Sequence, residues 1–198
     1  MVGTARRAMI AIASMCLIGL CLIIAWYTSR PMPVEDEQMI LSRALNLPPE
    51  RLSYHGVAGD EPVPGARSWM ILPLGGDGKA VGHIWTIRSK VQNYTPYLSG
   101  DLVDECPFCT NAGPLTEEEA ISEAKQIALR LWDLELADVE VRNVSTRPVQ
   151  LARADEPRYR IRVELTFRGR GRNSPRSASF SFVQDSGVCY RVNAQFKR

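Results

Sequence analysis

The stretch AMIAIASMCLIGLCLIIAWY, residues 8–27, determines how the rest of the chain must be read. It contains no charged side chain, and 20 residues in a helix extend about 30 Å, the thickness of a bilayer core. Only a helix or a closed barrel satisfies its own backbone polar groups in lipid, and one segment cannot close into a barrel. The sequence therefore predicts a transmembrane helix at residues 8–27.

The charges on either side of this stretch predict its orientation. Arg6 and Arg7 precede it, whereas the acidic run at residues 35–37 follows it. The positive-inside rule then places residues 1–7 in the cytoplasm and the rest outside the cell membrane. A cleaved signal peptide is the alternative, but its apolar core is shorter, about 7–15 residues, and Tyr27 is too large to precede a cleavage site. We expect a retained single-pass signal-anchor.

The composition of the remaining chain is that of a globular protein. Hydrophobic residues make up 45% and charged residues 23%, so a packed core is expected. Residues 31–156 contain 11 basic and 20 acidic side chains, whereas residues 157–198 contain ten basic and two acidic ones. This asymmetry favours charge pairing within the chain or an anionic partner. Outside a membrane, that partner is a protein or an anionic cell-envelope polymer or lipid, and no nucleic acid is expected.

The first half of the exported part reads as one helix followed by strands. A proline-containing tether covers residues 28–34, and an apolar stripe with acidic residues in its first turn predicts a helix at residues 35–45. Strands are predicted at residues 52–57, 68–74 and 80–87, the last two joined by a glycine-rich turn. In the third strand His83 alternates with apolar residues, so a core histidine is expected. These elements form a first α+β unit, residues 35–90, and residues 91–115 are read as an irregular linker.

The second half, residues 116–198, repeats this plan. Thr116 and Glu119 form a capping box, and an apolar stripe centred on Ile127 runs through the helix that follows, with Glu123 off the stripe. Strands are predicted at residues 139–144, 158–168, 178–184 and 188–196. In the last of these, alternation places Val188 and Val192 on the inner face and Cys189 on the outer one. The predicted fold class is α+β, with helix-on-antiparallel-sheet units.

Two stretches of the second half resemble the PepSY family of extracytoplasmic modules. These are LTEEEAISEA at residues 115–124 and FVQDSGV at residues 182–188, and the resemblance covers residues 115–196. The first half matches more weakly, through GDGKAV at residues 76–81. The resemblance implies two PepSY-like units in a non-catalytic module that is tethered to a membrane or protease and regulates peptidase or signalling activity. It implies no catalytic residues.

The cysteines outside the predicted membrane segment are Cys106, Cys109 and Cys189. The CPFC knuckle at residues 106–109 has four interpretations: a structural disulfide, a zinc half-site, a redox-active pair or unpaired thiols. Zinc ligation would be completed by His55 and His83 or by the same knuckle of a second chain. Acidic residues at 101, 104 and 105 disfavour the reactive thiolate. No other cofactor is expected.

One strand of the second unit predicts a basic face. Arg158, Arg160 and Arg162 alternate along it, and with Arg191 they are a candidate anion-binding set, although such a face is also typical of a solvated sheet. No Ser/His/Asp set, paired-carboxylate site or phosphate loop is present in the sequence. We therefore predict a membrane-anchored binding or regulatory module that is not an enzyme. The alternatives are a tethered thiol-disulfide oxidoreductase using Cys106 and Cys109, or a structural zinc-bound dimer.

Overall fold

The computed structural model describes residues 15, 17–22, 32–57, 66–73, 80–87, 89–96, 113–149, 158–168 and 174–196. The chain divides into two units, Met1–Pro33 and Val34–Arg198. In the first unit residues 17–22 are helical. Most of the predicted membrane segment, residues 8–27, lies outside the described residues. Within the described part, no helix combines the length and the apolar character that crossing a bilayer requires.

The described residues of the unit Val34–Arg198 form two α-helices, two single-turn 3-10 helices and eight strands. In chain order these are α2 (Val34–Leu45), η1 (Pro49–Arg51), β1 (Leu52–Val57), β2 (Arg67–Ile71), β3 (Gly82–Ile87), β4 (Lys90–Pro96), α3 (Glu117–Trp132), η2 (Leu136–Asp138), β5 (Val139–Val149), β6 (Arg158–Phe167), β7 (Pro175–Val183) and β8 (Cys189–Phe196).

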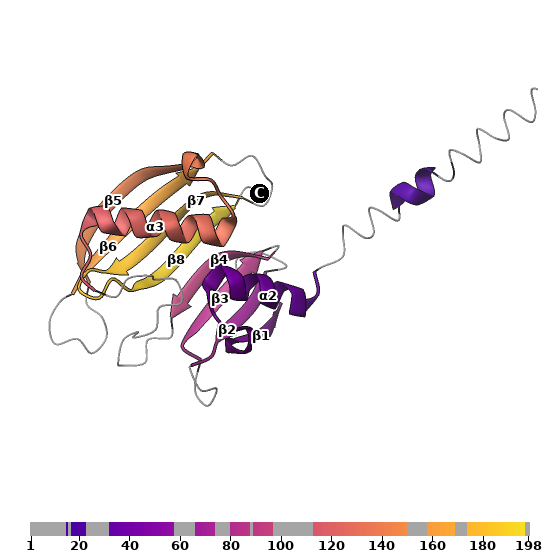
Figure 1. Cartoon of the computed structure of the whole chain (residues 1–198), viewed down its shortest axis with the longest axis horizontal. Helices are drawn as coiled ribbons and strands as arrows, with labels where there is room; N and C mark the ends of the chain where they lie inside the picture. Colours follow the sequence, from indigo (N-terminus) through magenta and orange to yellow (C-terminus); the bar gives the residue numbers. More distant parts are fainter. Residues whose placement is uncertain are drawn as a thin grey trace, which may run out of the picture. The chain divides into compact units, whose positions relative to one another are not determined.

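The eight strands form one antiparallel sheet in the order β1-β2-β3-β4-β8-β7-β6-β5, which confirms the α+β class (Figure 1). Each half is a helix followed by four strands. The halves meet where β4 pairs with β8, through Asn93 opposite Asn193 and Tyr94 opposite Val192. β4 lies mostly within residues 91–115, which the sequence pattern predicted to be a linker, so that prediction is wrong for this strand. β4 pairs along its length with β3 in a local hairpin, and its two pairs with β8, about 100 residues away, are non-local contacts that the local pattern of β4 does not indicate.

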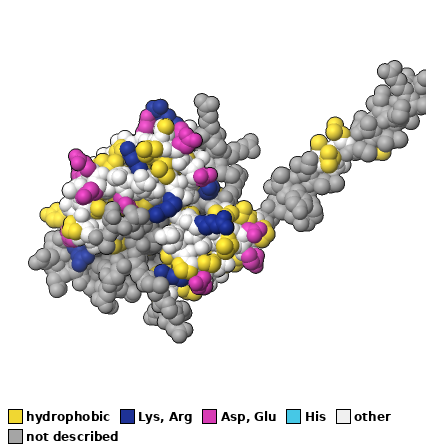
Figure 2. All heavy atoms as spheres, viewed as in Figure 1, with side chains coloured by type: hydrophobic (Ala, Val, Ile, Leu, Met, Phe, Trp, Pro, Cys, Tyr) yellow, Lys and Arg dark blue, Asp and Glu magenta, His cyan; other side chains and the backbone are white. Residues whose placement is uncertain are grey.

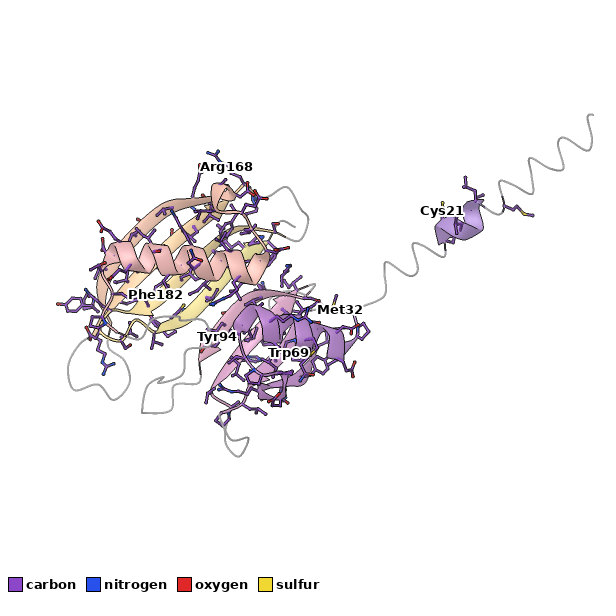
Figure 3. All side chains as sticks on the ribbon, in the orientation of Figure 1. Cys21, Met32, Trp69, Tyr94, Arg168 and Phe182 are labelled. Carbon is purple, nitrogen blue, oxygen red and sulfur yellow. The ribbon has the colours of Figure 1, made fainter. Side chains whose placement is uncertain are left out.

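Helices α2 and α3 cover the same face of this sheet, and the hydrophobic core lies between (Figure 1). The capping box of α3 is confirmed: the Glu119 backbone N–H donates to Thr116 Oγ1 at 3.2 Å, and the Thr116 N–H donates to Glu119 Oε2 at 2.8 Å. The apolar stripe of α3, with Ile127 fully buried, packs on the sheet. Figure 3 shows Trp69 and Tyr94 on the strands beside α2 and Phe182 on a strand beside α3.

A buried ion pair attaches α2 to the sheet. Glu37 is 2% exposed, pairs with the Arg67 guanidinium of β2 and accepts a 2.5 Å hydrogen bond from Thr86 Oγ1 of β3. The sequence pattern assigns Glu37 only to the acidic first turn of its helix. In the structure its position in the turn points it at the sheet, where two donors compensate the cost of burying the carboxylate.

Three predictions about which side chains face the core are wrong. Cys189 is fully buried opposite Phe182, because a bulge between β7 and β8 shifts the alternation of β8 by one residue. Glu123 is 6% exposed and belongs to the buried side of α3. In β3 the buried row is Gly82, Ile84 and Thr86, so half-buried His83 lies on the opposite face rather than in the core.

Candidate functional site

The face of the sheet opposite α2 and α3 is polar, and we refer to it as the open face. It consists of the residues whose side chains alternate with those of the core, such as Ser179 of β7 between Ala178 and Phe180. Two of its serines, Ser68 and Ser181, are themselves buried. Both described α-helices of the unit lie on the other side, and Asn193 and Gln195 of β8 are solvent-exposed. The open face is therefore the surface on which the sheet presents polar side chains to solvent.

The structure places all four predicted arginines on the open face. Arg158, Arg160 and Arg162 alternate with the inward-facing residues of β6. Arg162 lies opposite Ser181 of β7, and Ser181 lies opposite Arg191 of β8. Arg162 and Arg191 therefore belong to one cross-strand row, two strand spacings or about 10 Å apart, while Arg160 and Arg158 continue the basic surface along β6.

Two further arginines, which were not among the predicted ones, join this surface from β5. Arg147 lies directly opposite Arg160, and Arg142 occupies a bulge between Val141 and Asn143. The predicted strand ended at residue 144, whereas β5 extends to Val149. An unbroken period of two would have been the signal that assigns residues to one face. The bulge interrupts that period, so it does not assign both arginines to the same face.

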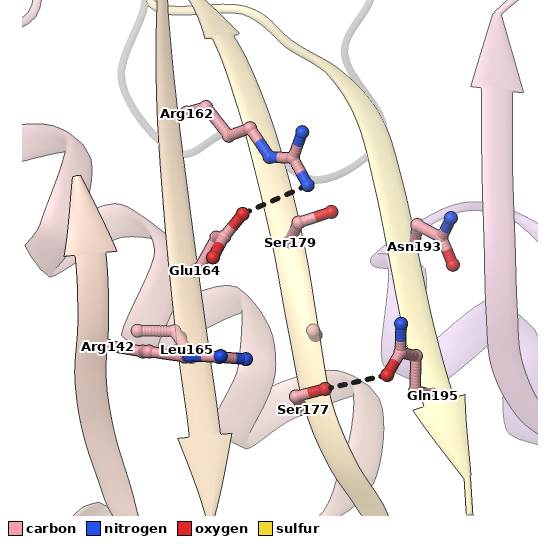
Figure 4. A pocket seen from close by; sticks show the side chains of 9 residues that line it. Arg142, Arg162, Glu164, Leu165, Ser177, Ser179, Asn193 and Gln195 are labelled. Carbon is pink, nitrogen blue, oxygen red and sulfur yellow. Dashed lines mark hydrogen bonds and ion pairs between the residues drawn. The ribbon is translucent and has the colours of Figure 1, made fainter. Parts of the chain in front are cut away.

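A shallow hollow of about 150 Å³ lies on the open face (Figure 4). In it, Arg162 forms an ion pair with Glu164 at 3.0 Å, and Ser177 Oγ donates to Gln195 Oε1 at 3.4 Å. The residues that line it are Arg142, Arg162, Glu164, Leu165, Ser177, Ala178, Ser179, Asn193 and Gln195. The hollow thus combines guanidinium, carboxylate, amide and hydroxyl groups from four strands.

The charge of the open face is strongly positive around this hollow. Six arginines, at positions 142, 147, 158, 160, 162 and 191, share the face with Glu140 and Glu164. Glu140 forms an ion pair with Arg168. The side chains of Arg162 and Glu164 are 44% and 28% exposed, so solvent screens their ion pair and the attraction between them is weak. By contrast, Figure 2 shows the helix-covered side, where basic and acidic side chains are interspersed with hydrophobic ones.

His83 lies on the open face of the first half. Its Nε2 is 2.5 Å from Ser68 Oγ, and its ring meets Trp85 edge-on with centroids 4.5 Å apart. Burial, and secondarily the nearby His55, lower the pKa of His83 below its usual value. The neutral imidazole is therefore the dominant form at pH 7.

The structure describes one of the three cysteines predicted to lie outside the membrane segment and leaves the other two undescribed. Cys106 and Cys109 lie outside the described residues, so the CPFC knuckle stays a prediction. Cys189 is a fully buried thiol whose pKa burial raises to about 12. In the part of the chain that the structure describes, no group of three or more His, Cys, Asp or Glu side chains is placed to hold a metal ion.

A second hollow of about 430 Å³ lies between the carboxyl ends of α2 and α3 and the β3–β4 turn. Its lining includes apolar Leu41 and Leu131 together with the cations Arg43 and Lys90. The carboxyl end of a helix carries partial negative charge, which basic side chains stabilise. Arg43 in the last turn of α2 and Arg130 in the last turn of α3 therefore complement the helix ends, and the open face remains the candidate site.

Compared with protein-family models, with curated proteins and with solved structures, the chain matches none of them.

Proposed function

We propose that this chain is a non-catalytic binding module of the extracytoplasmic space, tethered by residues 8–27, whose open face binds an anionic partner. The observation that carries the proposal is the placement of six arginines and a polar hollow on one solvent-facing side of the sheet. A guanidinium stays charged at any physiological pH and presents a fork of N–H donors that matches a carboxylate or phosphate.

The architecture of the second half supports the module interpretation. A capped helix, α3, is followed by four antiparallel strands, the element order that the PepSY resemblance of residues 115–196 implies. Modules of that family are regulatory and are tethered to membranes or proteases. The tether follows from the uncharged stretch at residues 8–27 and from Arg6 and Arg7 before it.

Binding is tested with the full chain in detergent micelles and two charge-reversal variants of equal net charge. Arg162→Glu/Arg191→Glu alters the open face, and Arg43→Glu/Lys125→Glu alters the helix-covered side. Polyglutamate and polygalacturonate serve as anionic probes in calorimetric titrations at low salt. We expect the first variant to lose at least about tenfold in affinity, and the second to bind like the unmodified chain, since charged contacts act locally once salt screens them. Equal losses in both variants, or no binding by the unmodified chain, would contradict the proposal.

The tether is tested by fusing a reporter that is active only outside the cytoplasm after Arg198. We expect reporter activity that stays with the membrane fraction after alkaline carbonate washing. Activity released into the soluble fraction would identify residues 8–27 as a cleaved signal, and absence of activity from a stable fusion would contradict the orientation.

A further inference from the structure

One cross-strand row on the open face joins both halves of the sheet. Reading from β3 to β5, each residue lies directly opposite the next in the row Trp85, Asn93, Asn193, Ser179, Glu164 and Asn143. Neighbouring strands are about 4.8 Å apart, so the five steps of this row extend about 24 Å. We refer to these six residues as the amide row. It passes through the hollow of Figure 4, where Glu164, Ser179 and Asn193 are visible.

The side chains of the amide row can form hydrogen bonds with the hydroxyl groups of a ligand. Asparagine amides and the serine hydroxyl both donate and accept hydrogen bonds, and the Glu164 carboxylate accepts them. A sugar hydroxyl is likewise a donor and an acceptor, so each position of the row can pair with one. Asn193 and Asn143 are exposed, and Asn93, Ser179 and Glu164 are half-buried, so a ligand laid on the face reaches them.

The neighbouring row supplies cations. Arg191, Ser181 and Arg162 lie opposite one another two residues along the same strands, about 7 Å from the amide row. Arg142 reaches the hollow from β5. A polymer bound along the amide row would therefore have a guanidinium beside it, within reach of its anionic substituents.

An indole marks one end of the amide row. Trp85 is half-buried on the open face, and its ring is held edge-on by His83 at a centroid distance of 4.5 Å. The indole is an apolar surface next to the polar side chains of the amide row. A sugar ring likewise has an apolar face and a polar rim, so the two surfaces are complementary.

We infer that the open face binds a linear acidic polysaccharide along the amide row, with its hydroxyls on the amides and Ser179 and its anionic groups on Arg162 and Arg191. This inference rests on the proposed function and specifies its partner. A peptide is a poorer occupant, because the strands beneath the row pair on both sides within the sheet and offer an added strand no free backbone groups. An anionic membrane is also a poorer occupant. The amide row contains a carboxylate and amides, and a lipid surface would remove water from these groups without replacing their hydrogen bonds.

The test uses the full chain in detergent micelles and three probes: a galacturonate octamer, its methyl-esterified neutral form and a C-terminally amidated glutamate octamer, which has the same number of carboxylates. The row variant is Ser179→Ala/Asn193→Ala. The matched control is Ser122→Ala/Gln126→Ala, at exposed positions of α3. Circular dichroism and the melting temperature show that each variant is folded before titration.

We expect the galacturonate octamer to bind at least about tenfold more tightly than the glutamate octamer, and the row variant to lose that preference while the control keeps it. The neutral octamer should bind weakly but detectably, and Trp85→Ala should weaken both sugar probes. If the glutamate octamer binds as tightly as the sugar, or if the row variant keeps its preference, the polysaccharide inference is overturned while anion binding by the open face stands. If neither anionic probe binds, the proposed function fails with it.

Discussion

Trp132, the last residue of α3, donates a buried hydrogen bond from Nε1 to the carbonyl oxygen of Val91 on β4 at 2.8 Å. The bond crosses from the second helix-and-sheet half to the first. Together with the pairing of Asn93 and Asn193, it makes the two halves share one core. The unit Val34–Arg198 should therefore unfold as one cooperative body.

Replacing Trp132 by Phe should destabilise both halves at once. The variant keeps an aromatic ring against Phe167 and Phe180 but leaves the Val91 carbonyl without its donor. We expect the free energy of unfolding to fall by about 1–3 kcal/mol. Denaturant unfolding followed by circular dichroism and by tryptophan fluorescence should give a single coincident transition. Two separated transitions, in the variant or in the unmodified chain, would show that the halves are independent domains.

The buried face of α3 is tested by a matched pair of aspartates. Ile127 is fully buried, and the adjacent Gln126 is exposed. Ile127→Asp loses apolar contacts and buries a carboxylate, so we expect it to cost at least about 3 kcal/mol. Gln126→Asp should change stability by no more than about 0.5 kcal/mol. Chemical denaturation of both variants checks this, and similar midpoints would mean that the helix face is misassigned.

His83 should make the fold less stable in acid. Its pKa is lowered, first by burial and then by His55, so the unfolded chain binds the proton more readily than the folded one. Stability from the neutral imidazole is therefore fully present above the unfolded pKa of about 6.5 and is lost as pH falls below it. We expect His83→Gln to lose less unfolding free energy between pH 7.5 and pH 5 than the unmodified chain does. An equal or larger loss in the variant would contradict this assignment.

The cysteines should separate by reactivity. Cys189 is fully buried and its pKa is raised to about 12, so it should react with an alkylating agent only after unfolding. We expect Cys106 and Cys109 to be unreactive as isolated because they are oxidised or metal-bound, and to react after reduction and chelation. Mass spectrometry of the alkylated full chain distinguishes the three sites. Rapid alkylation of Cys106 with an apparent pKa below about 7, together with insulin reduction, would favour the thiol-disulfide oxidoreductase.

Local signals in the sequence predicted the elements that depend on local interactions. The start of α3 follows from the Thr116 capping box, and β1 has the bounds that the sequence predicted. Elements that depend on distant partners were missed. β4 pairs with β3 in a local hairpin, but its pairing with β8, about 100 residues away, is non-local. Glu37 is buried because Arg67 and Thr86 come from strands 30 and 49 residues away.

The candidate site was predicted in part for the same reason. Alternation along β6 identified Arg158, Arg160 and Arg162, because that strand has no bulge between its ends and its register with β7 is regular. Arg142 occupies a bulge in β5 and was assigned to no face, whereas Cys189 precedes a bulge in β8 and was assigned to the wrong face. The amide row could not be predicted, because it requires the register of six strands.

The central claim, that the open face binds an anionic partner, is tested most directly by arginine footprinting. The full chain in detergent micelles is treated with phenylglyoxal, with and without polygalacturonate and, separately, polyglutamate, and modification of each arginine is measured by mass spectrometry. Arg162 and Arg191 should be protected severalfold by a polymer that binds, while Arg43 on the helix-covered side reacts at an unchanged rate. Equal protection of Arg43, or no protection of Arg162 and Arg191 by either polymer, would contradict the claim.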